Sequence, residues 1–119
     1  MSWVRLGSIG MFLAVALGAF GAHGLRGRLS PEMLAIFETG VRYQFYHSLG
    51  LFLVAWLSDR HPGALVTASG WAFVAGIVVF SGSLYLLSAT GVRWLGAVTP
   101  LGGLAFLAGW LLVLAATFR

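Results

Sequence analysis

Two histidines and a glutamine stand at the edges of long apolar runs. His23 ends the stretch GAFGAHG at 18–24, and Gln44 and His47 lie in YQFYHSLG at 43–50. Imidazole and carboxamide groups can hydrogen-bond, bind metals or move protons. They are unfavourable when buried away from water without a partner. The sequence therefore raises the question of what these three groups pair with.

Three kinds of chemistry suit such a set: a hydrogen-bonded clasp, a pocket for a small ligand or ion, and a metal or haem site. Buried polar groups are usually structural, which favours the clasp. Two histidines and a carboxylate could bind zinc, but a spacing such as HExxH is missing and the chain has no cysteine. We therefore predict no metal and no cofactor. Without a nucleophile motif such as GxSxG, we also expect no enzyme activity.

The composition places these groups in a membrane. Of 119 residues, 60% are hydrophobic and 8% are charged, whereas about a quarter are charged in an ordinary soluble domain. So short a chain cannot hide that much apolar surface from water. The net charge of +4 comes from single arginines scattered near segment ends. This distribution is typical of headgroup anchors, so we expect a lipid bilayer as partner and no nucleic acid.

Four apolar segments are long enough to cross a bilayer as helices. We predict an all-α membrane protein forming one integral membrane domain over 1–119, with an antiparallel bundle of four transmembrane helices. The spans cover about 3–22, 41–57, 64–87 and 94–118. A multi-pass protein of the bacterial cytoplasmic membrane fits this pattern. The arginines are balanced between the two sides, so the orientation is not predicted.

The connection between the first two spans contains a helix start. Ser30 can act as N-cap, Pro31 suits the first helical position, and Glu32 lies near the positive end of the helix dipole. Apolar residues then recur at helical spacing. We predict a short amphipathic interfacial helix at about 31–39, between the first and second spans, with a bend at Gly40.

Tracing the spans through the bilayer places most polar residues in one half of it. Around the second span, neighbouring faces carry Gln44 with His47, and Glu38 with Arg42, which we expect to pair at i, i+4. Polar groups at this depth normally face the bundle and find partners. The predicted polar cluster or ligand site consists of His23, Arg42, Tyr43, Gln44, His47, Ser81 and Tyr85.

Small residues predict where helices touch, because close backbone approach holds helices together in lipid. The first span has a ladder of four at strict four-residue spacing, Gly10, Ala14, Gly18 and Ala22. The third span has Ala72 and Gly76 in the same register, preceded by Ala68. We expect packing within the bundle; alternatively, a ladder mates with another copy or subunit. Four helices make a small bundle, so we expect a homo-oligomer or a larger membrane complex.

Four blocks in order resemble a known family. They are GAFGAHGL, FETGVRYQFYHSLGLFLVAWL, FSGSLYLLSATG and TPLGGLAFLAGW. The sequence is similar, over essentially its whole length, to the small four-span membrane proteins known as domain of unknown function 423. The resemblance implies a four-helix membrane protein and no particular activity. The predicted function is a non-enzymatic accessory or scaffold component of a membrane assembly; the alternative is a small channel or transporter with a polar site in one half of the bilayer.

Overall fold

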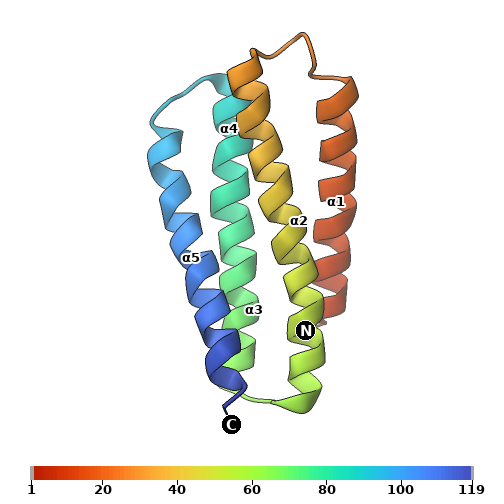
Figure 1. The fold of residues 1–119 in the computed structure, drawn as a ribbon, viewed down its shortest axis with the longest axis vertical. Coiled ribbons are helices and arrows are strands. Elements are labelled where there is room, and N and C mark those ends of the chain that lie inside the picture. Colours follow the sequence, from red (N-terminus) through yellow and green to blue (C-terminus); the bar gives the residue numbers. More distant parts are fainter. Residues whose placement is uncertain (1, 119) are drawn as a thin grey trace.

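The computed structural model describes residues 2–118, and within them every regular element is helical. This confirms the all-α prediction. Figure 1 shows the helical rods arranged antiparallel, side by side. The elements are α1 (Trp3–His23), α2 (Pro31–Arg60), α3 (Ala64–Gly76), the π-helical turn η1 (Ile77–Ser81), α4 (Gly82–Thr90) and α5 (Leu95–Ala116). The loops at 24–30 and 91–94 lie at one end, called the loop end; the turn at 61–63 and both termini lie at the other, the turn end.

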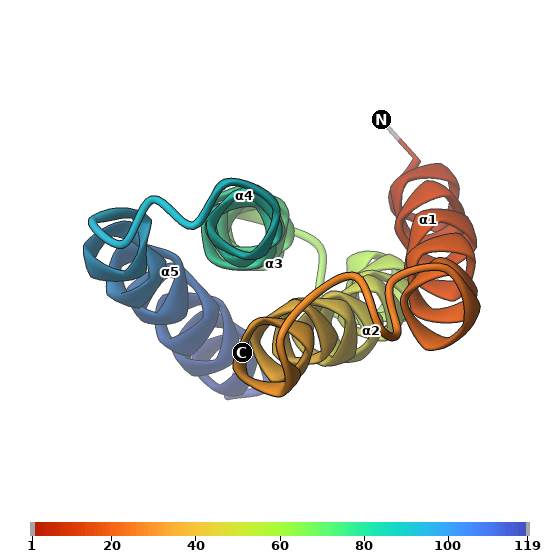
Figure 2. The ribbon, with the colours of Figure 1, turned by 90° about the horizontal axis from the view of Figure 1, so that it is seen from above.

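Within residues 2–118, three helical runs are long and apolar enough to cross a membrane: α1, the continuous run Ala64–Thr90 formed by α3, η1 and α4, and α5. The remaining rod, α2, has 30 residues and is therefore about 45 Å long. Seen from above in Figure 2, α1 and α5 lie on opposite flanks, with α2 and α3–α4 between them. The main helix pairings are α1 with α2 and α3 with α5.

The beginning of α2 corrects the predicted interfacial helix. Ser30 caps the helix as expected, its hydroxyl accepting a hydrogen bond from the backbone N–H of Met33 at 3.1 Å, and Pro31 is the first residue. However, 31–39 is continuous with the residues that follow, in one helix as far as Arg60. Gly40 is buried beside the Tyr85 ring, and the helix continues through it without a break. Gly40 therefore serves as a close packing position within α2.

The π-helical turn η1 keeps the buried face of the third rod pointing at its neighbours. Before the turn, Phe73 and Gly76 are buried three residues apart. After it, Ser81 and Leu84 are buried, again three apart, but the step from Gly76 to Ser81 is five residues. A π-turn accommodates one extra residue in an α-helix. It therefore resets the phase, so that both halves present their buried faces inward.

The α1–α2 contact runs along small residues of α1, but not along a strict four-residue ladder. Ala14 is fully buried, Gly10 lies against Ser48, and a Cβ at Gly18 would lie 3.4 Å from Val41. By contrast, Ala22 is exposed. Four residues turn an α-helix by about 400°, so a strict ladder drifts around the helix by about 40° at each step. The contact therefore continues at Gly7 and Gly21, both buried, and leaves Ala22 outside.

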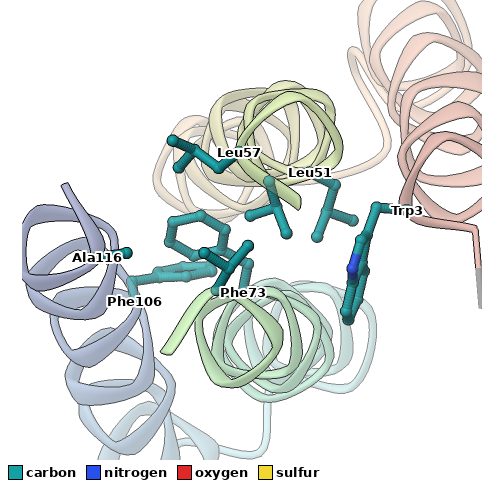
Figure 3. Packing of buried hydrophobic residues seen from close by; sticks show 8 residues of the cluster. Trp3, Leu51, Leu57, Phe73, Phe106 and Ala116 are labelled. Atoms are coloured by element: carbon teal, nitrogen blue, oxygen red, sulfur yellow. The ribbon is translucent and has the colours of Figure 1, made fainter. Parts of the chain in front are cut away.

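Between α3 and α5, glycines receive aromatic rings. Gly76 lies against Phe106, and a Cβ at Gly109 would stand 2.5 Å from the Phe73 ring and 3.4 Å from Ala72 Cβ. Ala68, further along, is exposed. Figure 3 shows Phe73 and Phe106 close together between the helices, with Trp3 on the far side of the cluster. This aromatic core lies directly beside the polar side chains of α2.

Candidate functional site

Gln44 connects three helices through its carboxamide. The side chain is 4% exposed; its Nε2 donates to the Gly10 carbonyl of α1 at 2.8 Å, and its Oε1 accepts from the Tyr85 hydroxyl of α4 at 2.6 Å. The approach to α1 is possible because Gly10 presents backbone instead of a side chain. The donor and acceptor ends of this buried amide are therefore both used between helices.

His47 lies one turn further along α2, where α5 approaches. Trp110 Nε1 donates to His47 Nε2 at 3.0 Å, and His47 Nδ1 lies 2.8 Å from the Tyr43 carbonyl. Since a carbonyl only accepts and an indole only donates, this pairing assigns the neutral tautomer with the proton on Nδ1. The imidazole also stacks on Phe106, with ring centroids 3.5 Å apart and planes within 8°. His47 thus has a partner at each nitrogen and on a ring face.

Serines complete the polar contacts towards the loop end. Ser81, at the end of η1, donates to the Gly40 carbonyl of α2 at 2.6 Å. Ser83 and Thr99 share a hydrogen bond of 2.6 Å between α4 and α5. These groups link the α3–α4 rod to α2 on one side and to α5 on the other.

The structure brings four of the seven predicted cluster residues into one hydrogen-bonded region and leaves three at its margin. Gln44, His47, Ser81 and Tyr85 belong to the contacts above. His23 and Arg42 are exposed, and Tyr43 is 37% exposed beside the cluster. His23 ends α1 at the loop end, whereas Gln44 contacts Gly10, more than three turns away along α1. The expectation that His23 and His47 share one cluster is therefore wrong.

Sequence reasoning missed the partners that α5 supplies. Trp110 and Phe106 hold His47, yet both sit in an apolar run whose helical phase relative to α2 cannot be read from the sequence. An indole N–H within such a run was the one available signal, because it needs an acceptor when buried. Ser48 was also missed; its buried Oγ has no hydrogen-bond partner within residues 2–118 and lies against Gly10.

Three grooves border the polar region; one, of about 160 Å³, lies between α1, α2 and the third rod and includes Gln44. The α2–α5 groove has a volume of about 580 Å³ and places the Tyr43 and His47 rings opposite Leu104 and Leu107 of α5. The α1–α2 groove, of about 300 Å³, lies near the loop end and carries the charged residues Glu38 and Arg42. No ion pair within 4.0 Å joins those two residues in the described chain, which corrects the pairing expected from their spacing. Residues 2–118 contain no group of three or more metal-ligating side chains.

Helices of this length and composition, packed through glycines and internal hydrogen bonds, define a multi-pass membrane protein. The comparison with protein families agrees. Residues 17–103 match the family described as protein of unknown function DUF423, and the chain belongs to this family.

Bacterial relatives extend the match to nearly the full chain. The chain is 52% identical to the UPF0382 membrane protein YwdK of Bacillus subtilis, over 98% of this chain and 96% of the relative. It is 45% identical to a UPF0382 membrane protein of Staphylococcus haemolyticus, over 98% and 95%. No solved structure matches the chain. The relatives support a bacterial membrane location and leave the activity open.

Proposed function

We propose that this protein crosses the membrane four times and acts without catalysis, as an accessory or scaffold component of a membrane assembly. The fourth crossing is assigned to α2, which lies between α1 and the α3–α4 rod and runs alongside both. A helix enclosed by spanning helices shares their depth. Its polar residues turn inward, where Gln44 and His47 find partners.

The observation that carries the scaffold proposal is an outward seam of leucines on α5. Leu104, Leu107, Leu111 and Leu114 follow a three- and four-residue alternation and are each between 54% and 65% exposed. This spacing is the a/d pattern with which one helix packs along another. The seam is exposed on the surface of the bundle, with Leu104 and Leu107 at the edge of the α2–α5 groove, so it suits an apolar helix of a partner membrane protein.

The polar groups support the same proposal. The carboxamide of Gln44, both nitrogens of His47 and the hydroxyls of Ser81 and Tyr85 are engaged in contacts within the chain. Groups engaged in this way hold helices together and are not free to bind or activate a substrate. This arrangement supports the proposal of a structural role for the bundle, with recognition on its outer surface.

Affinity purification in a mild detergent tests the scaffold proposal. We expect a membrane protein to co-purify in fixed stoichiometry with the wild type and to be lost from the double variant Leu107→Ala/Leu111→Ala. The matched control is Ile9→Ala/Phe12→Ala, which shortens exposed side chains on α1 (57% and 73% exposed). Loss of the partner from the α1 variant but not from the α5 variant would contradict the assigned surface.

A small channel or transporter is the second candidate, favoured by the α2–α5 groove. This groove brings Tyr43 and His47 to the outer surface between two helices. Purified protein in liposomes would then show reproducible, saturable flux of an ion or small metabolite, and His47→Leu would reduce it. Flux of that kind would displace the scaffold proposal, because a scaffold requires none.

A further inference from the structure

The α1–α2 groove combines an apolar wall with two charges. It is lined by Gly18 of α1 and by Phe37, Glu38, Val41, Arg42 and Phe45 of α2. Val41 lies level with Gly18, which is more than one turn before the end of α1. Arg42, the next residue, therefore lies several ångströms inside the level at which α1 ends. An arginine at this depth extends towards the headgroups and seeks an anion.

Within residues 2–118, no carboxylate forms an ion pair with Arg42. Glu38, one turn away on the same helix, lies beyond the 4.0 Å ion-pair distance, and the ion pair at this end joins Arg93 to Glu32 at 3.6 Å. Both Glu38 and Arg42 are exposed at the groove. The groove thus offers one positive and one negative group that are separated along the helix and do not form an ion pair with each other.

We propose that the α1–α2 groove binds a phospholipid whose headgroup carries both a phosphate and a primary ammonium. Arg42 holds the phosphate through its guanidinium, which matches phosphate oxygens in a bidentate fashion. Glu38 accepts hydrogen bonds from the ammonium. One acyl chain lies along Val41 and Phe45 towards the membrane interior. The inference rests on the proposed crossing by α2, which places the groove in the outer part of one leaflet.

The order of the charges along α2 fits this lipid better than an anionic one. Glu38 is four residues, about 6 Å, nearer the loop end than Arg42. In a zwitterionic headgroup the ammonium lies at or outside the depth of the phosphate, which is the same order. A headgroup with net negative charge would satisfy Arg42 but would offer no cation to Glu38. A choline headgroup would fill the space but cannot donate hydrogen bonds to the carboxylate.

Thermal unfolding in detergent, with short-chain lipids as probes, tests the site. We expect dihexanoyl phosphatidylethanolamine to stabilise the wild type more than the phosphatidylcholine and phosphatidylglycerol analogues do. Arg42→Gln and Glu38→Gln should each weaken the apparent affinity for the ethanolamine lipid by about tenfold. Arg42→Lys, which keeps the charge but loses the bidentate geometry, should retain only part of it. The controls Arg28→Gln and Glu32→Gln each remove a charge of the same sign at the same end of the molecule, but outside the groove. They should leave the affinity for the ethanolamine lipid unchanged.

Two results would overturn the proposal. One is stronger stabilisation by the glycerol lipid, with Glu38→Gln improving its binding, because the site would then be specific for anions. The other is equal stabilisation by all three lipids in the wild type and both groove variants. Neither result depends on a protein partner, so failure of the lipid site and failure of the scaffold proposal are distinguishable.

Discussion

Gln44 and His47 show how two polar side chains can lie in the apolar interior of this protein. Each meets groups that match its donors and acceptors: Gln44 meets the Gly10 carbonyl and the Tyr85 hydroxyl, and His47 meets Trp110 and the Tyr43 carbonyl. Unpaired, such groups would be strongly unfavourable in lipid. Paired, they contribute modestly to stability but fix the helix register, because other registers leave them without partners.

Gln44→Leu should lower the free energy of unfolding by about 1–2 kcal/mol, since two interhelical hydrogen bonds of about 0.6 kcal/mol or more are lost. A double-mutant cycle with Tyr85→Phe in detergent measures the shared bond, for which we expect a coupling of about 0.6 kcal/mol. Tyr43→Phe is the control, because the Tyr43 hydroxyl makes no hydrogen bond within the part of the chain that the structure describes. A coupling indistinguishable from zero would show that the 2.6 Å contact does not stabilise the bundle.

Trp110→Phe should leave the helices in place but remove the donor that selects the His47 tautomer. In the wild type, nitrogen NMR should find Nδ1 protonated and Nε2 unprotonated. In the variant we expect the second tautomer to become populated, since Nε2 no longer faces an indole N–H. Trp56→Phe, on the opposite part of α2 beside Arg60, is the control and should leave the His47 signals unchanged. A wild-type signal from protonated Nε2 would contradict the assignment.

The contact of α5 with η1 brings a glycine of one helix against the backbone of the other. A Cβ at Gly102 would come within 2.7 Å of the Phe80 Cα atom, with the Phe80 backbone nitrogen nearer still. The π-turn brings Phe80 to this place while keeping Ser81 on Gly40. The close packing of α5 on the third rod therefore depends on both Gly102 and the π-turn η1.

Gly102→Ala should destabilise the protein by about 1–3 kcal/mol, because a methyl group there meets backbone that cannot rotate away. Gly103→Ala is a matched control one residue along: its Cβ would lie 3.9 Å from the nearest atom, the Phe80 ring carbon Cδ2, which is ordinary contact. Unfolding in mixed detergent micelles measures both. Equal stability of the two variants would contradict the close packing of α5 on η1.

Deletion of Val78 should be tolerated, because a π-turn that loses its extra residue becomes a regular α-helix. Val78 is 66% exposed, so its removal takes nothing from the interior. Leu49 in α2 is 53% exposed, but α2 has no π-turn at this position that could absorb the loss of a residue. Its deletion would therefore rotate the residues that follow by about 100° relative to those before it. We expect the first variant to purify as a folded protein and the second to aggregate. Aggregation of the Val78 deletion variant together with folding of the Leu49 deletion variant would argue against the π-turn.

The whole molecule is a bundle whose flanking helices each rest on one main neighbour. On the α1 side, Trp3 makes a further link to the third rod: it lies over Gly70 and meets the Trp71 ring edge-on, with centroids 5.2 Å apart. On the other side, α5 packs along α3 and presents its leucine seam outward. The flanks of the bundle are therefore the surfaces available to lipid and to other proteins.

Single cysteines should map the proposed four crossings without background, since the chain has no cysteine. Arg28→Cys and Val92→Cys lie in the two connections at the loop end, and Pro62→Cys lies at the turn end. A membrane-impermeant maleimide applied to intact cells should label either positions 28 and 92 or position 62, but not both groups. Labelling of positions 28 and 62 from the same side would show that α2 does not cross the membrane.

The sequence by itself determined the solvent and the secondary structure. Sixty per cent hydrophobic residues in 119 require lipid, and long apolar runs in lipid must be helical, because only helices satisfy their backbone internally within one segment. The start of α2 could be read because Ser30 and Pro31 act through local contacts. The pairing of Gln44 or His47 with something inside the bundle could be expected from the unfavourable free energy of leaving them unpaired.

Only the tertiary structure decided which atoms meet. The role of Trp110 depends on the rotation of α5 against α2, and the sequence carries no local signal for that angle. The exposure of Ala22 and His23 follows from the 3.6-residue period acting over the length of α1. The continuity of α2 through Gly40 depends on Tyr85 and Ser81, about forty residues away. These outcomes arise from packing between distant segments, where each helix fixes the phase of the next.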